Sequence, residues 1–487
     1  MTTRQKIIRK LADDQAIFIS NKFVQKLISI FILMVALASP VGAQEKARVL
    51  VITDISNEPD DEESLVRFLV YANEYDVEGL VASTSTWLKK GPREDLIRRD
   101  IAAYAQVRTN LLKHATGYPT PEQLLAVTKT GQTGYGMAFV GEGKSTGGSQ
   151  LLIAAADRAD ARPLWLSIWS GANTLAQALT DVRATSSADD LKKFVAKLRV
   201  YSISDQDDAG AWIRREFPDL FYIVSPSNQD GKEYWRATWT GISGDRWYRN
   251  GPRHKFEMVD NPWLTEHVIK NHGRLGALYP QLKSSMEADT PSFMGLINNG
   301  LGWSESPAYG GWGGRYVLYR PSGENRNIWS NNDDSRDTVT ADIGITETSD
   351  PATIWRWREQ YQNDFAARMN WCVATDYTNA NHNPLAVLNG DRTKNVLTIA
   401  TTNDATVTLS AEGTSDPDGN AVSVKWWIYN EAGNVWGATL TATEGLKTEV
   451  HLPQLKHAGQ FHVILQAQDN GQPPLSAYRR AIIKVAP

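Results

Sequence analysis

Cysteine, net charge and long apolar runs are all scarce in this chain. One cysteine, Cys372, stands among 487 residues, which excludes an intrachain disulfide and leaves the stability of the fold to core packing. The formal charge is only −4 at pH 7, which gives no sign of a nucleic-acid partner or of an anionic membrane surface. Long apolar runs are scarce: residues 27–38 form the one run that stands out, and it is too short to span a bilayer comfortably.

The first 43 residues have the pattern of a signal peptide. Lys22 and Lys26 precede the apolar run, and the small residues around Val41 and Ala43 suit a signal peptidase. We therefore predict cleavage after Ala43 and a periplasmic or secreted protein without membrane contact after cleavage. A retained single anchor is the lesser alternative, and the sequence leaves a homo-oligomer open.

Residues 44–378 alternate short β-rich runs with amphipathic helical stretches. This alternation predicts an α/β domain in which a mostly parallel open sheet carries helices on both faces. The expected strands are 48–53, 77–83, 163–169, 198–203 and 220–224. The expected helices are 62–74, 93–112, 149–159, 172–183, 189–196, 208–216, 263–270, 275–285 and 351–371.

The pattern changes after the polar stretch 378–384. Several short runs with alternating apolar residues follow it, and turns rich in Gly, Asp and Asn separate them. Short strands at such close spacing predict an all-β sandwich of immunoglobulin-like type over residues 379–487.

Acidic residues gather where the first expected strand ends. Asp54 follows the apolar run 49–52, and Asp60 and Asp61 come after a short turn at the start of a helical stretch. Open α/β sheets place their ligands at the carboxyl ends of strands. A helix N-cap explains one aspartate. Three carboxylates this close repel one another, so a divalent cation, above all Ca²⁺, explains the group better.

Two later strand ends carry further polar groups. Asn173 follows the expected strand 163–169, where helix capping is the stronger alternative to a contact with a sugar hydroxyl. Asp205, Asp207 and Asp208 follow the expected strand 198–203. For these three aspartates, sugar binding or protonation of a leaving group stands level with an N-cap in a solvated loop.

Two loops hold the remaining candidates. Glu287 and Asp289 lie just before Pro291, where a carboxylate that caps a helix is the plain alternative to a site. In GGWGGRY, residues 310–316, Trp312 offers a stacking face for a sugar. Arg315 offers a partner for a carboxylated sugar, although a structural ion pair is the more common fate of such an arginine.

Taken together, these segments resemble the nucleoside-hydrolase-like cellulose-binding proteins of bacteria that degrade plant polysaccharide. The likeness covers nearly all of residues 46–487 and implies the nucleoside hydrolase fold with a Ca²⁺ site. It supports these two features better than it supports a named substrate. The segments that carry it are 83–88 (STSTWL), 203–224, 273–280 (GRLGALYP), 287–293 (EADTPSF), 310–316 and 416–433.

The resemblance also implies metal ligands. Asp54 falls on the family's metal-binding general base, and Asp61 falls on a bidentate Ca²⁺ ligand. Asp289 matches the aspartate that completes the metal shell, and the backbone carbonyl of Trp169 matches a further ligand. Asp60 matches the carboxylate that holds sugar hydroxyls.

The chain departs from the family pattern at the leaving group. Ala288 stands where the family often has a histidine. The candidate proton donors are therefore Asp207, Asp208 and Glu287. A second departure is Ile52, which stands where the family has its first aspartate.

Two functions are compatible with these features. One is Ca²⁺-dependent hydrolysis of an N- or O-glycosidic bond in a plant- or algal-derived glycan fragment, with Asp54 as the base and inversion at the anomeric carbon. The other is a non-catalytic carbohydrate-binding protein, binding cellulose for example, that keeps a vestigial pocket. The missing histidine favours binding alone, whereas the retained aspartates favour the enzyme. Carbohydrate is the expected partner in both cases.

Overall fold

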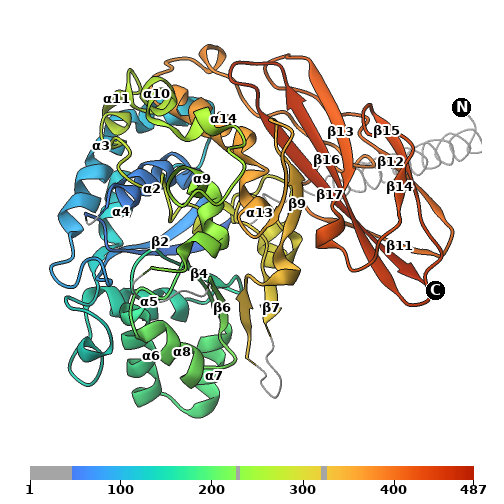
Figure 1. Ribbon diagram of the computed structural model, residues 1–487. Helices are drawn as coiled ribbons and strands as arrows, with labels where there is room; N and C mark the ends of the chain where they lie inside the picture. The colour runs from blue at the N-terminus through green and yellow to red at the C-terminus, as the bar shows by residue number, and fades with distance from the viewer. Residues whose placement is uncertain (1–45, 57, 226–230, 320–325) are drawn as a thin grey trace, which may run out of the picture. The chain divides into compact units, whose positions relative to one another are not determined.

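Strands β1–β8 form one sheet in the order β3-β2-β1-β4-β5-β6-β8-β7 (Figure 1). Neighbouring strands pair in parallel, except that β7 runs antiparallel to β8 at one edge. The mostly parallel sheet expected from the sequence is thus confirmed. The strands are β1 (Ala47–Thr53), β2 (Tyr75–Ala82), β3 (Thr128–Thr130), β4 (Leu164–Ile168), β5 (Leu198–Ser202), β6 (Phe221–Val224), β7 (Val317–Tyr319) and β8 (Ile328–Ser330).

The computed structural model describes residues 46–56, 58–225, 231–319 and 326–487. The predicted signal peptide 1–43 lies outside these residues. Within the described ranges, no helix combines the length and the apolarity that a membrane crossing needs.

Alternate side chains of β1 enter two different cores. Leu50 and Ile52 pack with the helices on one face, which are α5 (Gly147–Asp157), α6 (Asn173–Thr185), α7 (Ala188–Ala196) and α8 (Ala209–Glu216). Val49 and Val51 pack on the opposite face with α2 (Pro59–Val70), α3 (Glu94–His114), α4 (Pro121–Ala126) and α14 (Arg358–Trp371). Figure 1 shows the first group below the sheet and α2, α3 and α14 above it. This burial on both faces explains why β1 reads as a continuous apolar run.

The expected strands agree with β1, β2, β4, β5 and β6 to within two residues. The expected helix 275–285 is wrong: α11 covers Gly273–Gly276 only, and Pro280 follows, which has no N–H to donate and restricts the residue before it. The expected helix 351–371 is two helices, α13 (Ala352–Trp355) and α14. The sequence reading also missed β3, β7 and β8, which are three residues long each.

The chain between β6 and α14 is made of short elements. Among them are the 3-10 turn Tyr234–Arg236, the helices α9 (Gly244–Trp247), α10 (Asn261–Leu264) and α12 (Pro291–Met294), and the antiparallel pair β9 (Asp337–Thr340) and β10 (Thr346–Ser349). No hydrophobic period of a regular helix or strand could mark such short pieces in the sequence.

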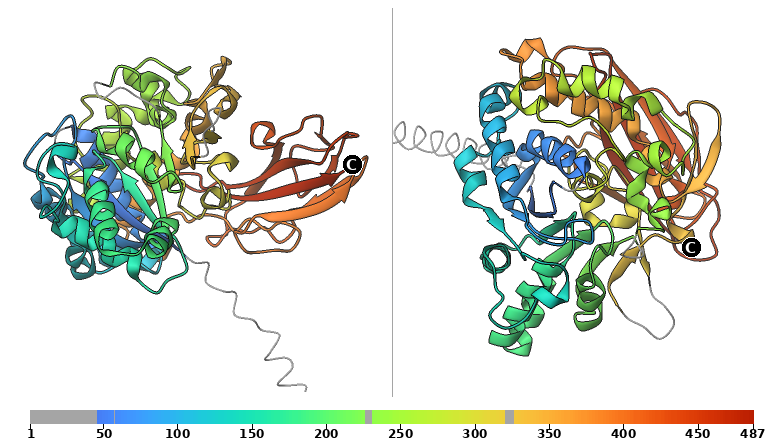
Figure 2. Two further views of the ribbon diagram at one scale, coloured as in Figure 1. Left: turned by 90° about the horizontal axis from the view of Figure 1, so that it is seen from below. Right: turned by 60° about the vertical axis from the view of Figure 1, so that its left-hand side comes forward.

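The C-terminal segment forms two β-sheets, as expected from the sequence. One has the order β11-β17-β16-β13 and the other β12-β15-β14, and the two enclose one hydrophobic core. The left view of Figure 2 shows their strands as two layers. The strands are β11 (Leu397–Thr402), β12 (Thr406–Ser410), β13 (Val422–Ile428), β14 (Thr439–Leu440), β15 (Lys447–His451), β16 (Gly459–Asp469) and β17 (Ser476–Ala486).

Strand β17 is hydrogen-bonded to the loop that follows α12. The backbone N–H of Tyr478 donates to the carbonyl of Asn299 at 3.0 Å. The buried Arg480 donates to the carbonyls of Leu301 at 2.7 Å and Gly310 at 3.0 Å. At Gly300, which has φ of 95°, a Cβ atom would lie 1.8 Å from the carbonyl oxygen of Tyr478, so only glycine fits this approach.

An aromatic cluster joins the last turn of α2 to α12. Phe68 of α2 stacks on Tyr75 with ring centroids 5.3 Å apart, and it meets Phe293 of α12 edge to face at 5.2 Å. The Trp169 indole N–H donates to the hydroxyls of Ser167 at 2.8 Å and Ser292 at 3.0 Å. These contacts fix the last turn of α2 and the short helix α12 relative to the end of β4.

Replacing Phe68 with alanine should lower the free energy of unfolding by about 3–5 kcal/mol, because it leaves a cavity between α2 and α12. Denaturant unfolding followed by tryptophan fluorescence measures this change. Phe139, which is 44% exposed, supplies the matched control. Its alanine variant should change the stability by less than about 1 kcal/mol, and equal losses in the two variants would contradict the structural role of Phe68.

Candidate functional site

The turn between β1 and α2 delivers the first three carboxylates. Asp54 follows β1 directly, while Asp60 and Asp61 lie in the first turn of α2 behind Pro59. Proline suits the first helical position, and the positive end of the helix dipole favours carboxylates there. Ser56 in the turn adopts φ of 108°, a strained conformation for a residue with a side chain.

Hydroxyl groups orient two of these carboxylates. The Thr53 hydroxyl donates to Asp61 Oδ1, and the Ser85 hydroxyl donates to Asp54 Oδ2. Ser85 follows β2, the neighbour of β1 in the sheet. The carboxyl ends of two parallel strands therefore supply both the acids and the groups that orient them.

Asp289 brings the fourth carboxylate from a distant part of the chain. It lies just before α12, and its own backbone carbonyl accepts hydrogen bonds from the N–H of Ser292 at 3.0 Å and from the Ser292 hydroxyl at 2.6 Å. Asp60, Asp61 and Asp289 each offer a carboxylate oxygen within 4.8 Å of the others, and all three side chains are buried. Asp54 lines the same cavity.

Burial and mutual repulsion disfavour the charged forms of these four carboxyl groups. Burial raises the pKa of Asp54 to about 7 and that of Asp60 to about 8, and the charges of Glu58 and, for Asp60, of Asp54 add to this. Burial, followed by the neighbouring aspartates, also raises the pKa of Asp61 and Asp289 well above the ordinary value. The cluster can ionise fully only if a positive charge joins it.

The protein itself provides no such charge among the described residues that line the cavity, which include no lysine, arginine or histidine. Two buried oxygens, Asp60 Oδ1 and Asp289 Oδ2, also have no hydrogen-bond partner within the part of the chain that the structure describes. Buried acceptors without donors are rare. The donor set, made of carboxylates only, fits a hard cation such as Ca²⁺.

Trp169 lines the cavity, and its backbone carbonyl, expected as a further ligand, already has a hydrogen-bond partner. It accepts a hydrogen bond from the Gln206 side-chain amide at 2.6 Å. A carbonyl oxygen has two lone pairs, so this contact leaves one for a cation.

The walls of the cavity are aromatic. Tyr234 and Trp239 meet edge to face at 5.2 Å, and Tyr248 lies next to Trp239. Trp87 and Trp247 at the rim are 41% and 55% exposed. The cavity encloses about 80 Å³, and its lining is Asp54, Glu58, Asp60, Asp61, Trp87, Trp169, Ile203, Gln206, Tyr234, Trp239, Trp247, Tyr248, Ser284, Ser285, Ala288 and Asp289.

Three sequence candidates for a catalytic acid lie outside this lining. Asp207 accepts the backbone N–H groups of Ala172, Asn173 and Ala209 at 2.9–3.1 Å, and it thereby fixes the starts of α6 and α8. Burial raises the pKa of Asp207 to about 7, against the lowering effect of these amides. Asp208 accepts the Met137 N–H at 2.8 Å.

Glu287 is the third candidate, and it forms a buried ion pair with Arg67 of α2. The Tyr279 and Thr290 hydroxyls also donate to it, both at 2.8 Å. Glu287 thus ties α2 to the segment before α12, and its carboxylate is fully occupied.

The remaining predicted substrate contacts have structural partners too. Asp205 forms a two-point ion pair with Arg214 at 2.6–2.8 Å. The Asn173 amide donates to the carbonyl of Gly134 at 2.8 Å. Trp312 is buried against Tyr361 and Tyr478, and Arg315 pairs with the buried Asp337 at 2.7 Å. None of the four lines the cavity within the described part of the chain.

The sequence-based predictions do not include Glu58, Gln206 or most of the aromatic wall among the site residues. Trp87 lies in the stretch STSTWL that had been singled out only for family likeness. Tyr234, Trp239, Trp247 and Tyr248 come from short irregular elements without a periodic pattern. Their one sequence signal is a high density of Trp and Tyr where no core helix or strand is expected.

Comparison with known proteins decides the family. The model of the nucleoside hydrolase-like domain of cellulose-binding Sde182 matches residues 48–316, and that of the C-terminal domain of cellulose-binding protein Sde0182 matches residues 406–485. The chain belongs to this family.

A solved structure supports the assignment over most of the chain. It is a nucleoside hydrolase-related hypothetical protein from Saccharophagus degradans that is associated with carbohydrate metabolism, with 36% identity, a TM-score of 0.77, and coverage of 91% of this chain and 100% of that chain. The effector proteins XOO4466 and XopQ, the latter complexed with adenosine diphosphate ribose, follow at 11% and 12% identity, TM-scores of 0.30 and 0.31, and coverage of 68% of this chain and 95% of theirs. No curated protein matches the chain.

Replacing Glu287 with glutamine should lower the free energy of unfolding by about 3–5 kcal/mol, because the buried Arg67 charge loses its partner. Chemical denaturation measures this loss. The control is Asp95→Asn, which breaks an exposed ion pair with Arg93 and should leave the stability nearly unchanged. A fully stable Glu287→Gln protein would contradict the structural role of this carboxylate.

Proposed function

We propose that this protein is a Ca²⁺-dependent hydrolase of N- or O-glycosidic bonds in plant- or algal-derived glycan fragments, and that it inverts the anomeric configuration. The observation that carries the proposal is the convergence of Asp54, Asp60, Asp61 and Asp289 in one aromatic-walled cavity. Buried carboxylates in such number need a cation, and aromatic faces beside polar groups suit sugar rings.

Asp60, Asp61 and Asp289 would hold the Ca²⁺, with the Trp169 carbonyl as a further oxygen ligand. The family resemblance implies Asp54 as a ligand and Asp60 as a sugar contact; we assign Asp60 to the metal because its oxygen is one of the three that lie within 4.8 Å of one another. When bound, Ca²⁺ supplies a positive charge that acidifies a coordinated water and attracts sugar hydroxyls.

Asp54 would act as the general base. Its Oδ2 is held by the Ser85 hydroxyl, which leaves the other oxygen to accept a proton from the attacking water. The rim side chains Trp87 and Trp247 would stack on the sugar and exclude water from one side of it. Attack by water on the face opposite to the leaving group produces inversion.

Family membership supports a carbohydrate ligand, since the matching family is described as cellulose-binding and the related solved protein as associated with carbohydrate metabolism. Export, expected from residues 1–43, favours a glycan over an intracellular nucleoside. Neutral cello-oligosaccharides are therefore the first probes, beside aryl glycosides and plant oligosaccharides.

One observation favours the second candidate, carbohydrate binding without turnover. Ala288 lines the cavity at the position where nucleoside hydrolases often carry a histidine, and an alanine side chain cannot donate a proton to a leaving group. Turnover assays decide between the two functions, because binding alone requires no base at Asp54.

Ca²⁺ should bind the purified protein and raise its melting temperature. At a Ca²⁺ concentration of about 100 times the Kd, the native state gains about 2.7 kcal/mol. Asp289→Asn and Asp61→Asn should each weaken Ca²⁺ binding. Loss of a residue that only orients a ligand typically costs roughly 10–100-fold in affinity, and loss of a ligand itself should cost more. Thermal unfolding measures the melting temperature and calorimetric titration measures the affinity, with Asp208→Asn as the matched control outside the cavity. If the wild-type protein takes up no Ca²⁺, the metal assignment fails.

Asp54→Asn should reduce kcat by about 10²–10⁴-fold on any substrate that the wild type hydrolyses, as expected for loss of a general base. Trp247→Ala should act mainly on KM, and Asp208→Asn should leave both constants unchanged. Product analysis by NMR should show the inverted anomer. Hydrolysis by Asp54→Asn at the wild-type rate would remove the base assignment, and binding without any turnover would favour the second function.

A further inference from the structure

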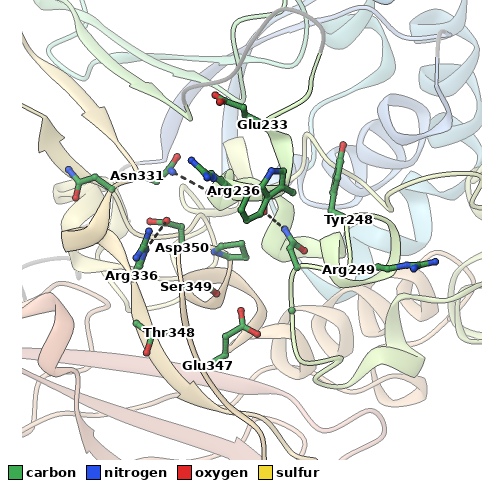
Figure 3. A pocket seen from close by; sticks show the side chains of 15 residues that line it. Glu233, Arg236, Tyr248, Arg249, Asn331, Arg336, Glu347, Thr348, Ser349 and Asp350 are labelled. Carbon is green, nitrogen blue, oxygen red and sulfur yellow. Dashed lines mark hydrogen bonds and ion pairs between the residues drawn. The ribbon is translucent and has the colours of Figure 1, made fainter.

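A second, larger cleft shares a wall with the acidic cavity. It encloses about 760 Å³, and Tyr248 lines both spaces. Its sides come from the 3-10 turn Tyr234–Arg236, the segment after α9, the segment that follows β8, and strand β10. Figure 3 shows Arg236, Tyr248 and Glu347 among the side chains arranged around it.

The two spaces differ in what they can hold. The acidic cavity, at about 80 Å³, falls well below the roughly 300–1,000 Å³ of sites that enclose an organic ligand, whereas the cleft lies within that range. A ligand that reaches the four aspartates with one end would therefore have to place the rest of its body elsewhere. The cleft is the adjoining space with room for it.

The lining of the cleft suits a neutral, hydroxyl-rich ligand. Three arginines, Arg236, Arg249 and Arg336, are matched by three carboxyl groups, Glu233, Glu347 and Asp350. Hydrogen-bonding side chains fill the space between them, namely Asn250, Asn331, Asn332, Thr348 and Ser349. The charged side chains of the lining thus carry no net formal charge and offer both donors and acceptors, and sugar hydroxyls both donate and accept.

Two asparagines fix the turn that carries the aromatic face of the cleft. The Asn250 amide donates to the carbonyl of Trp235 at 2.6 Å and to the Thr240 hydroxyl at 2.8 Å. The Asn331 amide donates to the carbonyl of Arg236 at 3.4 Å. The Arg236 guanidinium lies 4.6 Å from the centre of the Trp235 ring, yet the Trp235 side chain stays 48% exposed. A fixed, exposed indole among polar groups is a ready stacking face for a sugar ring.

We propose that this cleft binds the continuing chain of a neutral oligosaccharide whose terminal sugar reaches the four aspartates with one end. Trp235 and Tyr248 stack on successive rings, and the arginine, asparagine and carboxyl groups bind their hydroxyls. This inference rests on the proposed function in that the terminal sugar lies at the four aspartates. It adds that the ligand is a chain and not a single sugar.

Calorimetric titration with cello-oligosaccharides, from the disaccharide to the hexasaccharide, tests the proposal. The full chain carrying Asp54→Asn is used with Ca²⁺ present, so that no ligand is cleaved. Affinity should rise by about tenfold with length, a gain equivalent to about 1.4 kcal/mol. Adding Trp235→Ala should remove this gain and leave the affinity for the disaccharide unchanged.

Trp436→Ala is the matched control, because this tryptophan of the C-terminal sheets is 66% exposed and lines neither space. It should preserve the gain with length. If Trp436→Ala removes the gain and Trp235→Ala does not, the C-terminal sheets bind the chain and the proposal is overturned. Absence of binding, or of any gain with length, overturns it as well.

An acidic series, the oligogalacturonates, tests the neutral character of the ligand. Tighter, Trp235-dependent binding of that series would overturn the assignment of a neutral chain. The proposed hydrolase fails separately, when the wild type binds the cello-oligosaccharides with the length-dependent gain but cleaves no substrate.

Discussion

Mutual repulsion among four buried carboxylates is the constraint on which the rest of this structure depends. Asp54, Asp60, Asp61 and Asp289 come from two regions more than two hundred residues apart in sequence and meet in one cavity. Burial alone already disfavours their charged forms, and proximity adds to this. The fold holds them together through neighbouring contacts, namely the aromatic cluster of Phe68, the helix start at Pro59 and the buried pair of Arg67 with Glu287. Contacts around the cavity stabilise this arrangement, but the described residues that line the cavity supply no positive charge. A bound cation would neutralise the carboxylates.

At another strand end, carboxylates are stabilised by partners within the protein. Asp207 is satisfied by three backbone amides, and Asp205 by Arg214. Both carboxylates therefore have hydrogen-bond donors from the protein, and Asp207 fixes the starts of α6 and α8. The acids of the cavity keep oxygens without partners, Asp60 Oδ1 and Asp289 Oδ2 among the described residues. Asp205 and Asp207 thus differ from Asp60 and Asp289 in their hydrogen-bond partners.

The shape of the space around the acids is a second feature of the site. The cavity around them is small, and its aromatic wall continues through Tyr248 into a cleft nearly ten times larger in volume. Short, irregular elements between β6 and α14 build both walls. Loops on a rigid sheet are where binding surfaces concentrate, because they can vary without loss of the core. Asp54, Asp60 and Asp61 come from the turn after β1, whereas the irregular segment supplies Asp289 and most of the aromatic wall.

Local patterns in the sequence predict the central strands, the long helices and the gathering of Asp54, Asp60 and Asp61, because apolar period and strand-end position are local properties of the chain. Asp289 was found by family likeness and not by any local pattern. Only the tertiary structure separated the acids that line the cavity from Asp207, Asp208 and Glu287, since an amide or guanidinium partner far along the chain decides which carboxylate is free. It also places Trp312 in the core, pairs Arg315 with Asp337, and brings Trp87, Trp247 and Tyr248 to the cavity lining. Exposure and partnership depend on packing between segments, and no window of sequence contains that information.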